Sequence, residues 1–433
     1  MSTSPVAADQ TSTFPRFLDL AYPNIERGDG VWLYTTSGER ILDACSGGAM
    51  VSSLGHGARE IIDAGARQAE KIAYFYMDHF TNEPQERLAE RLVAVAAPEM
   101  ARVRFASSGS EANETALRLA RAYHVDRGEP ERWRVISPGQ AYHGSTMATL
   151  ALTGRARTLQ DPYAPYLSPH LHIGNGESAL SELDQRLEEA GPGTVAAFFC
   201  EPISGAAYPA YSPPEKFWQG LDARRKQYGF LICFDEVVTG MGRTGSWFAY
   251  QQLPIEPDIV TTGKGLGAGY APISAVLCKQ HVYDAIDRGS RFFDLGHTWD
   301  GAPISCATGL AVLDALAGRG LVQRVRERGP RLLADLRSAV EDNRLVAEVR
   351  GRGFLLGVSL VDLPDEMHAD ERVEDAALDH GLLVSATHST ADGYAGDEVL
   401  LAPAFTSTDE ELEMMVLRFR QALADVARSL AQG

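Results

Sequence analysis

A lysine in a glycine-rich loop has the setting that most favours chemistry in this chain. Lys264 follows the apolar segment 259–263 and precedes Gly265. It lies neither on an amphipathic helix nor in a run of charges, and the glycines on both sides let another molecule approach its amine. A lysine in a partly dry site has a lowered pKa and can attack a carbonyl to form a Schiff base. A solvated loop lysine is the common alternative for the same pattern.

Two further apolar segments end in ionisable residues. Segment 198–200 ends at Glu201, and segment 231–234 ends at Asp235. In open parallel sheets, ligands bind at the carboxyl ends of the strands. We therefore expect two carboxylates and the amine of Lys264 to meet over one crevice.

A turn rich in serine and glycine forms a candidate anion site. Ser108, Gly109 and Ser110 follow the predicted strand 102–106 and open the predicted helix 111–127. Unpaired N–H groups and the helix dipole favour a phosphate there. An ordinary capping box explains the same residues, because Glu111 follows Ser108 at the required spacing of three residues.

An aromatic residue completes a recognisable ligand. Tyr142 and His143 come after the predicted strand 134–137, where a tyrosine can stack on a flat ring. The ligand then has a phosphate for the 108–110 turn, a basic ring nitrogen for Asp235 and an aldehyde for Lys264. These features describe pyridoxal 5′-phosphate, PLP.

Motifs for other ligands are either absent or lack the structural context that they require. Segment 263–268 matches GxGxxA, but the residues after it do not open a helix, as a dinucleotide fingerprint requires. No GxxxxGK[ST] and no GxSxG occurs, which excludes a Walker loop and a nucleophile elbow. His170 and His172 stand alone without HExxH, so we expect no metal site.

The order of elements predicts an α/β fold with two domains. From about residue 58, predicted helices such as 86–97 and 215–228 alternate with short apolar strands, which indicates a mostly parallel sheet covered on both faces. A hairpin within 30–43 and a C-terminal region around 353–360 and 398–403 predict a small α+β domain. We expect a PLP-binding large domain over 61–303 and a discontinuous small domain from 1–60 and 304–433.

Composition narrows the partners and the compartment. Of the residues, 45% are hydrophobic and 23% charged, and the formal net charge of -18 disfavours nucleic acid and anionic membranes. Five cysteines without a CxxC, together with an N-terminus unlike a signal peptide, predict reduced thiols in a cytoplasmic protein.

From about residue 25 to 425 the chain resembles the class III, or omega, aminotransferases of PLP fold type I, the aspartate-aminotransferase-like fold. The matching segments share their order and spacing with the family: 28–33, 54–56, 108–112, 142–144, 201–203, 235–245, 262–265, 296–299 and 400–403. The resemblance implies a homodimer, or a tetramer built from it, with shared active sites.

The resemblance also implies roles for single residues. Lys264 would form the Schiff base with PLP and move the proton between Cα and C4′, while Asp235 would keep the pyridine nitrogen protonated. Thr298 would reach the phosphate bound by the partner subunit. The other implied cofactor-binding residues surround the ring and the phosphate within one chain: Ser108, Gly109, Ser110, Tyr142, His143, Glu201 and Val237.

The implied reaction is a ping-pong transfer of an amino group from a primary amine or amino acid to a keto acid or aldehyde. A PLP-dependent aminomutase, racemase or dialkylglycine-type decarboxylase shares the same motifs and stays open. A catalytically inactive relative and a Schiff-base aldolase without PLP fit them less well.

One family feature is missing. Many members bind the substrate carboxylate through an arginine shortly before the segment at 400–403, but residues 379–406 contain no arginine. The substrate carboxylate is therefore absent or is bound by another group, such as Arg155 or His388. Small residues at Gly47, Gly48 and Ala49, where some relatives have a large aromatic, suggest either room for a bulky amine or simple packing drift.

Overall fold

The computed structural model describes residues 5–7, 10–96, 98–153, 161–364, 367–387 and 397–432. Seven strands form the large sheet in the order β6-β12-β11-β10-β9-β7-β8. Only β12 runs antiparallel to its neighbours, so the sheet is mostly parallel, as predicted. In chain order the strands are β6 (Met100–Ala106), β7 (Arg134–Pro138), β8 (Leu171–Ile173), β9 (Val195–Cys200), β10 (Leu231–Glu236), β11 (Ile259–Thr262) and β12 (Ser274–Lys279).

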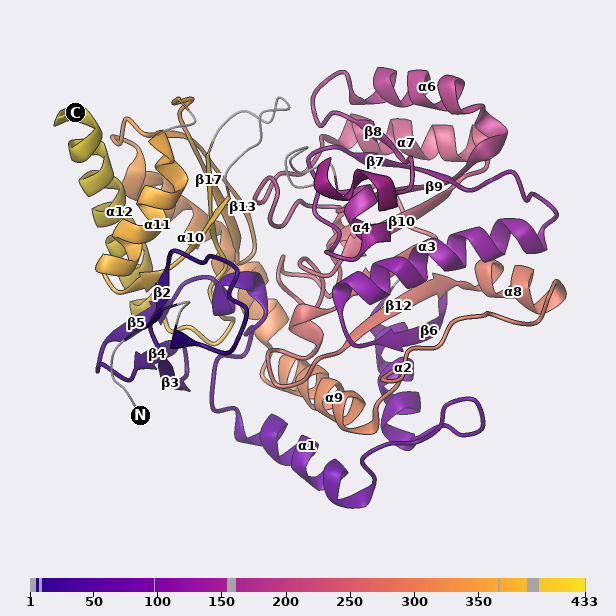
Figure 1. Cartoon of the computed structure of the whole chain (residues 1–433), viewed down its shortest axis with the longest axis horizontal. Helices are drawn as coiled ribbons and strands as arrows, with labels where there is room; N and C mark the ends of the chain where they lie inside the picture. The colour runs from indigo at the N-terminus through magenta and orange to yellow at the C-terminus, as the bar shows by residue number, and fades with distance from the viewer. Residues whose placement is uncertain are drawn as a thin grey trace.

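Helices cover both faces of this sheet (Figure 1). Side chains alternate across a strand, and in β9 Ala197 and Phe199 pack in one apolar cluster while Phe198 and Cys200 pack in another. Because both faces are buried, every residue of β9, β10 and β11 is buried, which explains their continuous apolar runs. The flanking helices are α2 (Glu83–Val95), α3 (Gly109–Asp126), α4 (Met147–Leu152), α6 (Ala179–Ala190), α7 (Glu215–Tyr228) and α8 (Gln280–Arg288).

Segments from both ends of the chain form the second part of the molecule, at the left of Figure 1. Its sheets are β13-β14-β17-β16 and β15-β5-β4-β3, and the latter joins C-terminal β15 to N-terminal β5 in parallel. The division of the chain at residues 60 and 303 stays a prediction. The strands are β3 (Ile25–Asp29), β4 (Trp32–Thr35), β5 (Arg40–Asp43), β13 (Val346–Arg352), β14 (Leu355–Leu360), β15 (Leu382–Leu383), β16 (Ser385–Thr387) and β17 (Glu398–Leu401).

Helices α10 (Leu321–Val340), α11 (Ala369–Asp379) and α12 (Asp409–Gln432) accompany these strands. Helix α9 (Pro303–Gly318) packs against α1 (Arg59–Lys71) and α2. Across the described ranges no single helix is long and apolar enough to span a membrane. Only α9 and α10 taken together reach that length and composition, across a 60° bend.

The N-terminal arm before β3 contains one short strand pair. Strand β1 (Val6–Ala7) pairs antiparallel with β2 (Ala21–Tyr22), and both residues of β2 are exposed. Local pattern does not reveal a pair of two-residue strands, because neither strand is long enough to show alternation.

Candidate active site

Three strand ends meet in one cavity. Strands β9, β10 and β11 are parallel neighbours, with Phe234 opposite Cys200 and Asp235 opposite Thr261. The residues that follow or end these strands therefore share one edge of the sheet. They line a cavity of about 140 Å³, with Gly109, Ser110, Asn113, Tyr142, His143, Gly144, Glu201, Asp235, Val237, Val238 and Lys264 in its wall.

Lys264 starts a 3₁₀ turn that runs to Leu266. Its φ of 39° is left-handed, a conformation that costs a non-glycine residue about 1 kcal/mol and that often marks functional sites. Burial lowers the pKa of the Lys264 amine, while Asp235 and Glu201 act in the opposite direction. A lowered pKa increases the fraction of neutral, nucleophilic amine.

Two glycines that follow Lys264 lie close to other parts of the chain. A Cβ at Gly265 would lie 3.3 Å from Met241 Cβ, and a Cβ at Gly267 would lie 2.1 Å from the Ala271 carbonyl oxygen. Gly267 therefore lets the chain pack closely on itself, while the role of the glycines on both sides of Lys264 in the approach to its amine stays a prediction.

Asp235 is held by three donors. Its Oδ2 accepts from Asn113 Nδ2 at 2.7 Å and faces His143 Nδ1 at 2.8 Å, and its Oδ1 accepts from Val237 N at 3.0 Å. Only 4% of Asp235 is exposed. Three hydrogen bonds and burial fix the carboxylate in one orientation at the cavity wall.

Asn113 is a site residue that sequence reasoning did not single out. Besides Asp235, its amide binds the His143 carbonyl oxygen and Thr261 Oγ1, both at 2.7 Å. It therefore connects α3, β11 and the loop after β7. The available signal was its position four residues after Gly109, which places both residues on one helix face.

The start of α3 serves as a cap and as a cavity wall at once. Ser108 forms a capping box with Glu111, and Ser108 is absent from the cavity wall. Gly109 and Ser110 do line the cavity. A Cβ at Gly109 would lie 2.9 Å from Val237 Cγ1, so glycine is needed for the helix start to approach Val237.

The remaining predicted site residues fall into two groups. Tyr142 and Val237 line the cavity, as does His143, whose ring packs edge-on against Phe199 at 4.9 Å. Nε2 of His143 is buried without a hydrogen-bond partner. Thr298 is exposed and does not line the cavity of its own chain.

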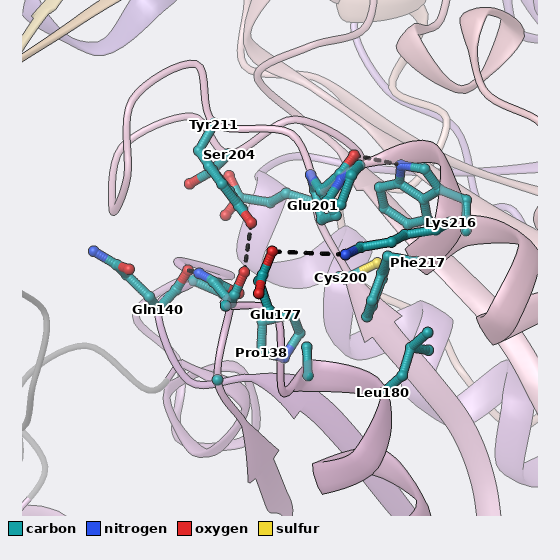
Figure 2. Close-up of a pocket in the computed structure, with 18 residues that line it drawn as sticks. Pro138, Gln140, Glu177, Leu180, Cys200, Glu201, Ser204, Tyr211, Lys216 and Phe217 are labelled. Carbon is teal, nitrogen blue, oxygen red and sulfur yellow. Dashed lines mark hydrogen bonds and ion pairs between the residues drawn. The ribbon is translucent and has the colours of Figure 1, made fainter. Parts of the chain in front are cut away.

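Glu201 borders two cavities. Its Oε1 accepts from Gly205 N at 2.8 Å and its Oε2 from Tyr142 N at 3.3 Å. Figure 2 shows a second cavity of about 300 Å³ beside it, between apolar residues such as Leu180 and Phe217. Burial raises the pKa of Glu201 to about 7, which His143 opposes and Asp235 reinforces.

The raised pKa of Glu201 predicts a pH-dependent contribution to stability. Between about pH 4.5 and 7 the unfolded carboxyl releases its proton while the folded one keeps it, so this contribution falls as pH rises and is constant above pH 7. Glu201→Gln removes the effect. We expect the unfolding free energy of the variant, relative to the parent, to increase by on the order of 2 kcal/mol from pH 5 to pH 8.

Chemical denaturation of the cofactor-free protein at both pH values measures this difference. Any loss of stability that the amide causes equally at pH 5 and pH 8 cancels when the two values are subtracted. Asp222→Asn is the control without a pH-dependent difference: although partial burial opposes it, Lys226 and Arg225 lower the pKa of Asp222, so this carboxylate is charged in both the folded and the unfolded state at pH 5 and pH 8. An unchanged or negative difference for Glu201→Gln would contradict the prediction.

The cavity fits PLP. The α3 N-terminus offers N–H groups to a phosphate, Asp235 offers a carboxylate to a ring nitrogen, and Lys264 offers an amine to an aldehyde. The residues are thus complementary to each polar end of the cofactor.

Two sequence-based suggestions for the substrate pocket have different outcomes. Gly47 and Gly48 adopt φ values of 82° and 72°, so backbone conformation by itself accounts for these glycines. Arg155, His388 and segment 390–396 lie outside the described residues.

Comparison with known proteins places this fold and site in one family. Residues 18–423 match the aminotransferase class-III family. The chain is 33% identical to the uncharacterized aminotransferase YodT of Bacillus subtilis, over 95% of this chain and 97% of that one. It is 32% identical to the diaminobutyrate–2-oxoglutarate transaminase of Halomonas elongata, over 94% and 91% of the two chains.

Among solved structures, the omega transaminase of Pseudomonas jessenii in complex with PMP superposes with a TM-score of 0.90 at 29% identity, covering 98% of both chains. The fold and the site define a PLP enzyme of fold type I. The chain belongs to the class III aminotransferases, and it transfers amino groups with PLP as cofactor.

Proposed function

We propose that this aminotransferase takes its amino group from a primary amine that carries no carboxylate on the reacting carbon. PLP supplies, when bound, an aldehyde that bonds to amines and a ring that accepts electrons. Lys264 Nζ would hold the cofactor through its aldehyde and would act as the group that accepts and returns the substrate proton. Asp235 would face the protonated ring nitrogen, and its partners Asn113 and His143 keep the carboxylate oriented.

The rest of the wall binds and positions. Gly109 and Ser110 would bind the phosphate at the start of α3. Tyr142 and Val237, which also line the cavity, would hold the ring. Glu201 borders the space where the substrate enters.

The charges of the cavity carry the proposal on the substrate. Among the residues described, its charged lining consists of Lys264, Asp235 and Glu201, and no arginine is included. The chain also has no arginine between Asp379 and Thr406. A substrate carboxylate next to Asp235 and Glu201 would meet repulsion and no bidentate partner, whereas an uncharged substituent would not.

The test compares donors that differ only in the carboxylate. Phenylalanine and 2-phenylethylamine are mixed in single turnovers with the PLP enzyme, and the change in the cofactor absorption band gives the rate. We expect the amine to react at least about tenfold faster. A faster reaction of the amino acid that is lost in Arg155→Ala or His388→Ala would show that one of these residues binds the carboxylate, and would overturn the proposal.

We further propose a homodimer in which Thr298 reaches the phosphate in the partner's site. Exposed aromatic residues occur here: Trp299, next to Thr298, packs edge-on against Tyr74 at 5.8 Å, and Tyr76 and Phe80, which follow Tyr74 in the chain, are 53% and 67% exposed. Such a patch favours burial against another chain. Chains with Lys264→Ala and Thr298→Ala are mixed, and the hybrid dimer should regain one fully active site. Monomers in sedimentation, or no regain in hybrids, would contradict this arrangement.

We propose a cytoplasmic location on the strength of the cysteines. All five are free thiols and buried, which suits a reducing compartment. Fractionation of the producing cells tests the location, and recovery outside the cytoplasm would refute it.

A further inference from the structure

We propose that Arg350, from the small C-terminal sheet, is a positioning residue for Glu201 in the cofactor cavity. This inference rests on the proposed function, in which Glu201 borders the substrate. Arg350 lies on β13 and does not line the cavity. The connection runs through the loop at 204–211, which belongs to the PLP-binding part of the chain.

The first step joins Glu201 to this loop. Gly205 N donates to Glu201 Oε1 at 2.8 Å, so the carboxyl orientation depends on where the loop places Gly205. The loop is closed by backbone hydrogen bonds between Ser204 and Tyr211 at 2.8 Å and between Ala210 and Ser204 at 2.9 Å. Figure 2 shows Ser204 and Tyr211 beside Glu201. The loop therefore moves as one piece, and any contact that holds it also holds Gly205.

The second step joins the loop to Arg350. Its Nε donates to the Pro209 carbonyl oxygen at 3.2 Å, and its guanidinium lies 4.3 Å from the ring centre of Tyr208. Strand β14 presses on the same place, because a Cβ at Gly357 would lie only 2.1 Å from the Pro209 oxygen. The small sheet thus holds the loop at Tyr208 and Pro209, while the Tyr211 hydroxyl donates to the Asn175 carbonyl oxygen at the other end of the loop.

The third step fixes Arg350 itself. Its Nη2 pairs with Glu398 on β17 at 2.6 Å, and its Nη1 binds Glu348 at 2.6 Å and Ser359 on β14 at 2.5 Å. Glu398 is 2% exposed in its side chain and Arg350 is 9% exposed. The guanidinium donates to acceptors on three strands and also to the Pro209 carbonyl oxygen of the loop, so it transmits the position of the small sheet to Glu201.

A double-mutant cycle separates this role from simple stabilisation. Arg350→Met is compared in the parent and in a Glu201→Gln background, by single-turnover rate with the amine donor. We expect about a tenfold loss in the parent and less than a twofold loss in the Glu201→Gln background, because positioning matters only when the carboxyl is present. The matched control is Arg337→Met: Arg337 on α10 donates to the Val349 carbonyl oxygen on the same strand, at 2.9 and 3.1 Å.

Arg337→Met should act equally in both backgrounds. Equal losses for Arg350→Met in both backgrounds, or no loss in either, would overturn the proposal. Tyr208→Leu, which removes the ring under the guanidinium but leaves the ion pairs, replaces Arg350→Met if that variant does not fold. It should show the same dependence on Glu201.

A second measurement does not depend on catalysis, so it tests the role of Arg350 separately from the proposed function. A lost hydrogen bond to the charged form raises a carboxyl pKa, so Arg350→Met should shift the Glu201 titration upward by about 1 pH unit. The shift is measured from the free energy of unfolding between pH 5 and pH 9. Four proteins are compared: the parent and Arg350→Met, each with either Glu or Gln at position 201. The other charged or titratable groups that line the two cavities beside Glu201 are present in all of them, namely Lys264, Asp235, His143, Tyr142, Cys200, Tyr211, Lys216 and Glu177. An enzyme that fails with every amine but shows this shift would refute the proposed function and leave the role of Arg350 standing.

Discussion

Replacing Lys264 with alanine is expected to lower the rate of amino-group transfer by about 10⁴-fold or more, while PLP still binds. Lys264 contributes both the amine that bonds the cofactor and the group that moves the proton, and general acid–base catalysis alone accounts for about 10²- to 10⁴-fold. The proposed phosphate site at Gly109 and Ser110 and the carboxylate of Asp235 do not depend on the lysine. The protein should therefore keep its cofactor through gel filtration.

Single-turnover absorbance after addition of an amine measures the rate, and a small primary amine in solution should restore part of it by accepting the proton. Lys226→Ala is the control, because Lys226 is 72% exposed on α7 and pairs with Asp222. We expect that variant to react at the parent rate. Turnover in Lys264→Ala within tenfold of the parent would disprove the assigned role.

The second large effect is expected from Asp235→Asn, which keeps the shape and removes the charge. A buried charge that loses its partner costs about 3–5 kcal/mol, which corresponds to between about 10²- and 10⁴-fold in rate or cofactor affinity. Asn113 and His143 would also point donors at an amide that accepts fewer hydrogen bonds.

Titration of PLP into the cofactor-free protein gives the affinity, and single turnovers give the rate. The matched control is Asp258→Asn. Asp258 is a buried aspartate that directly precedes β11 and accepts from Ile232 N at 2.8 Å, away from the cavity. This control should lose stability but keep its PLP affinity. If Asp235→Asn and Asp258→Asn lose PLP affinity equally, the loss does not come from a contact between Asp235 and the cofactor.

Much of this site was predictable because the signals are local. Parallel strands buried on both faces are continuous apolar runs, and their carboxyl ends share one edge of the sheet. Glu201, Asp235 and Lys264 therefore converge as the sequence predicted. The antiparallel direction of β12 was not predicted, because strand direction depends on how the chain returns and not on its composition.

The sequence alone determined the types of chemical groups at the strand ends, the serine–glycine turn and the lack of an arginine between Asp379 and Thr406. Only the tertiary structure decided that Ser108 caps the helix while Gly109 and Ser110 face the cavity, that Asn113 orients Asp235, and that Arg350 reaches the loop beside Glu201. The physical reason is distance along the chain. Asn113 and Asp235 are separated by 122 residues, and Arg350 and Pro209 by 141. A hydrogen bond over such a separation leaves no periodic trace in the sequence and exists only once the sheet has brought its ends together.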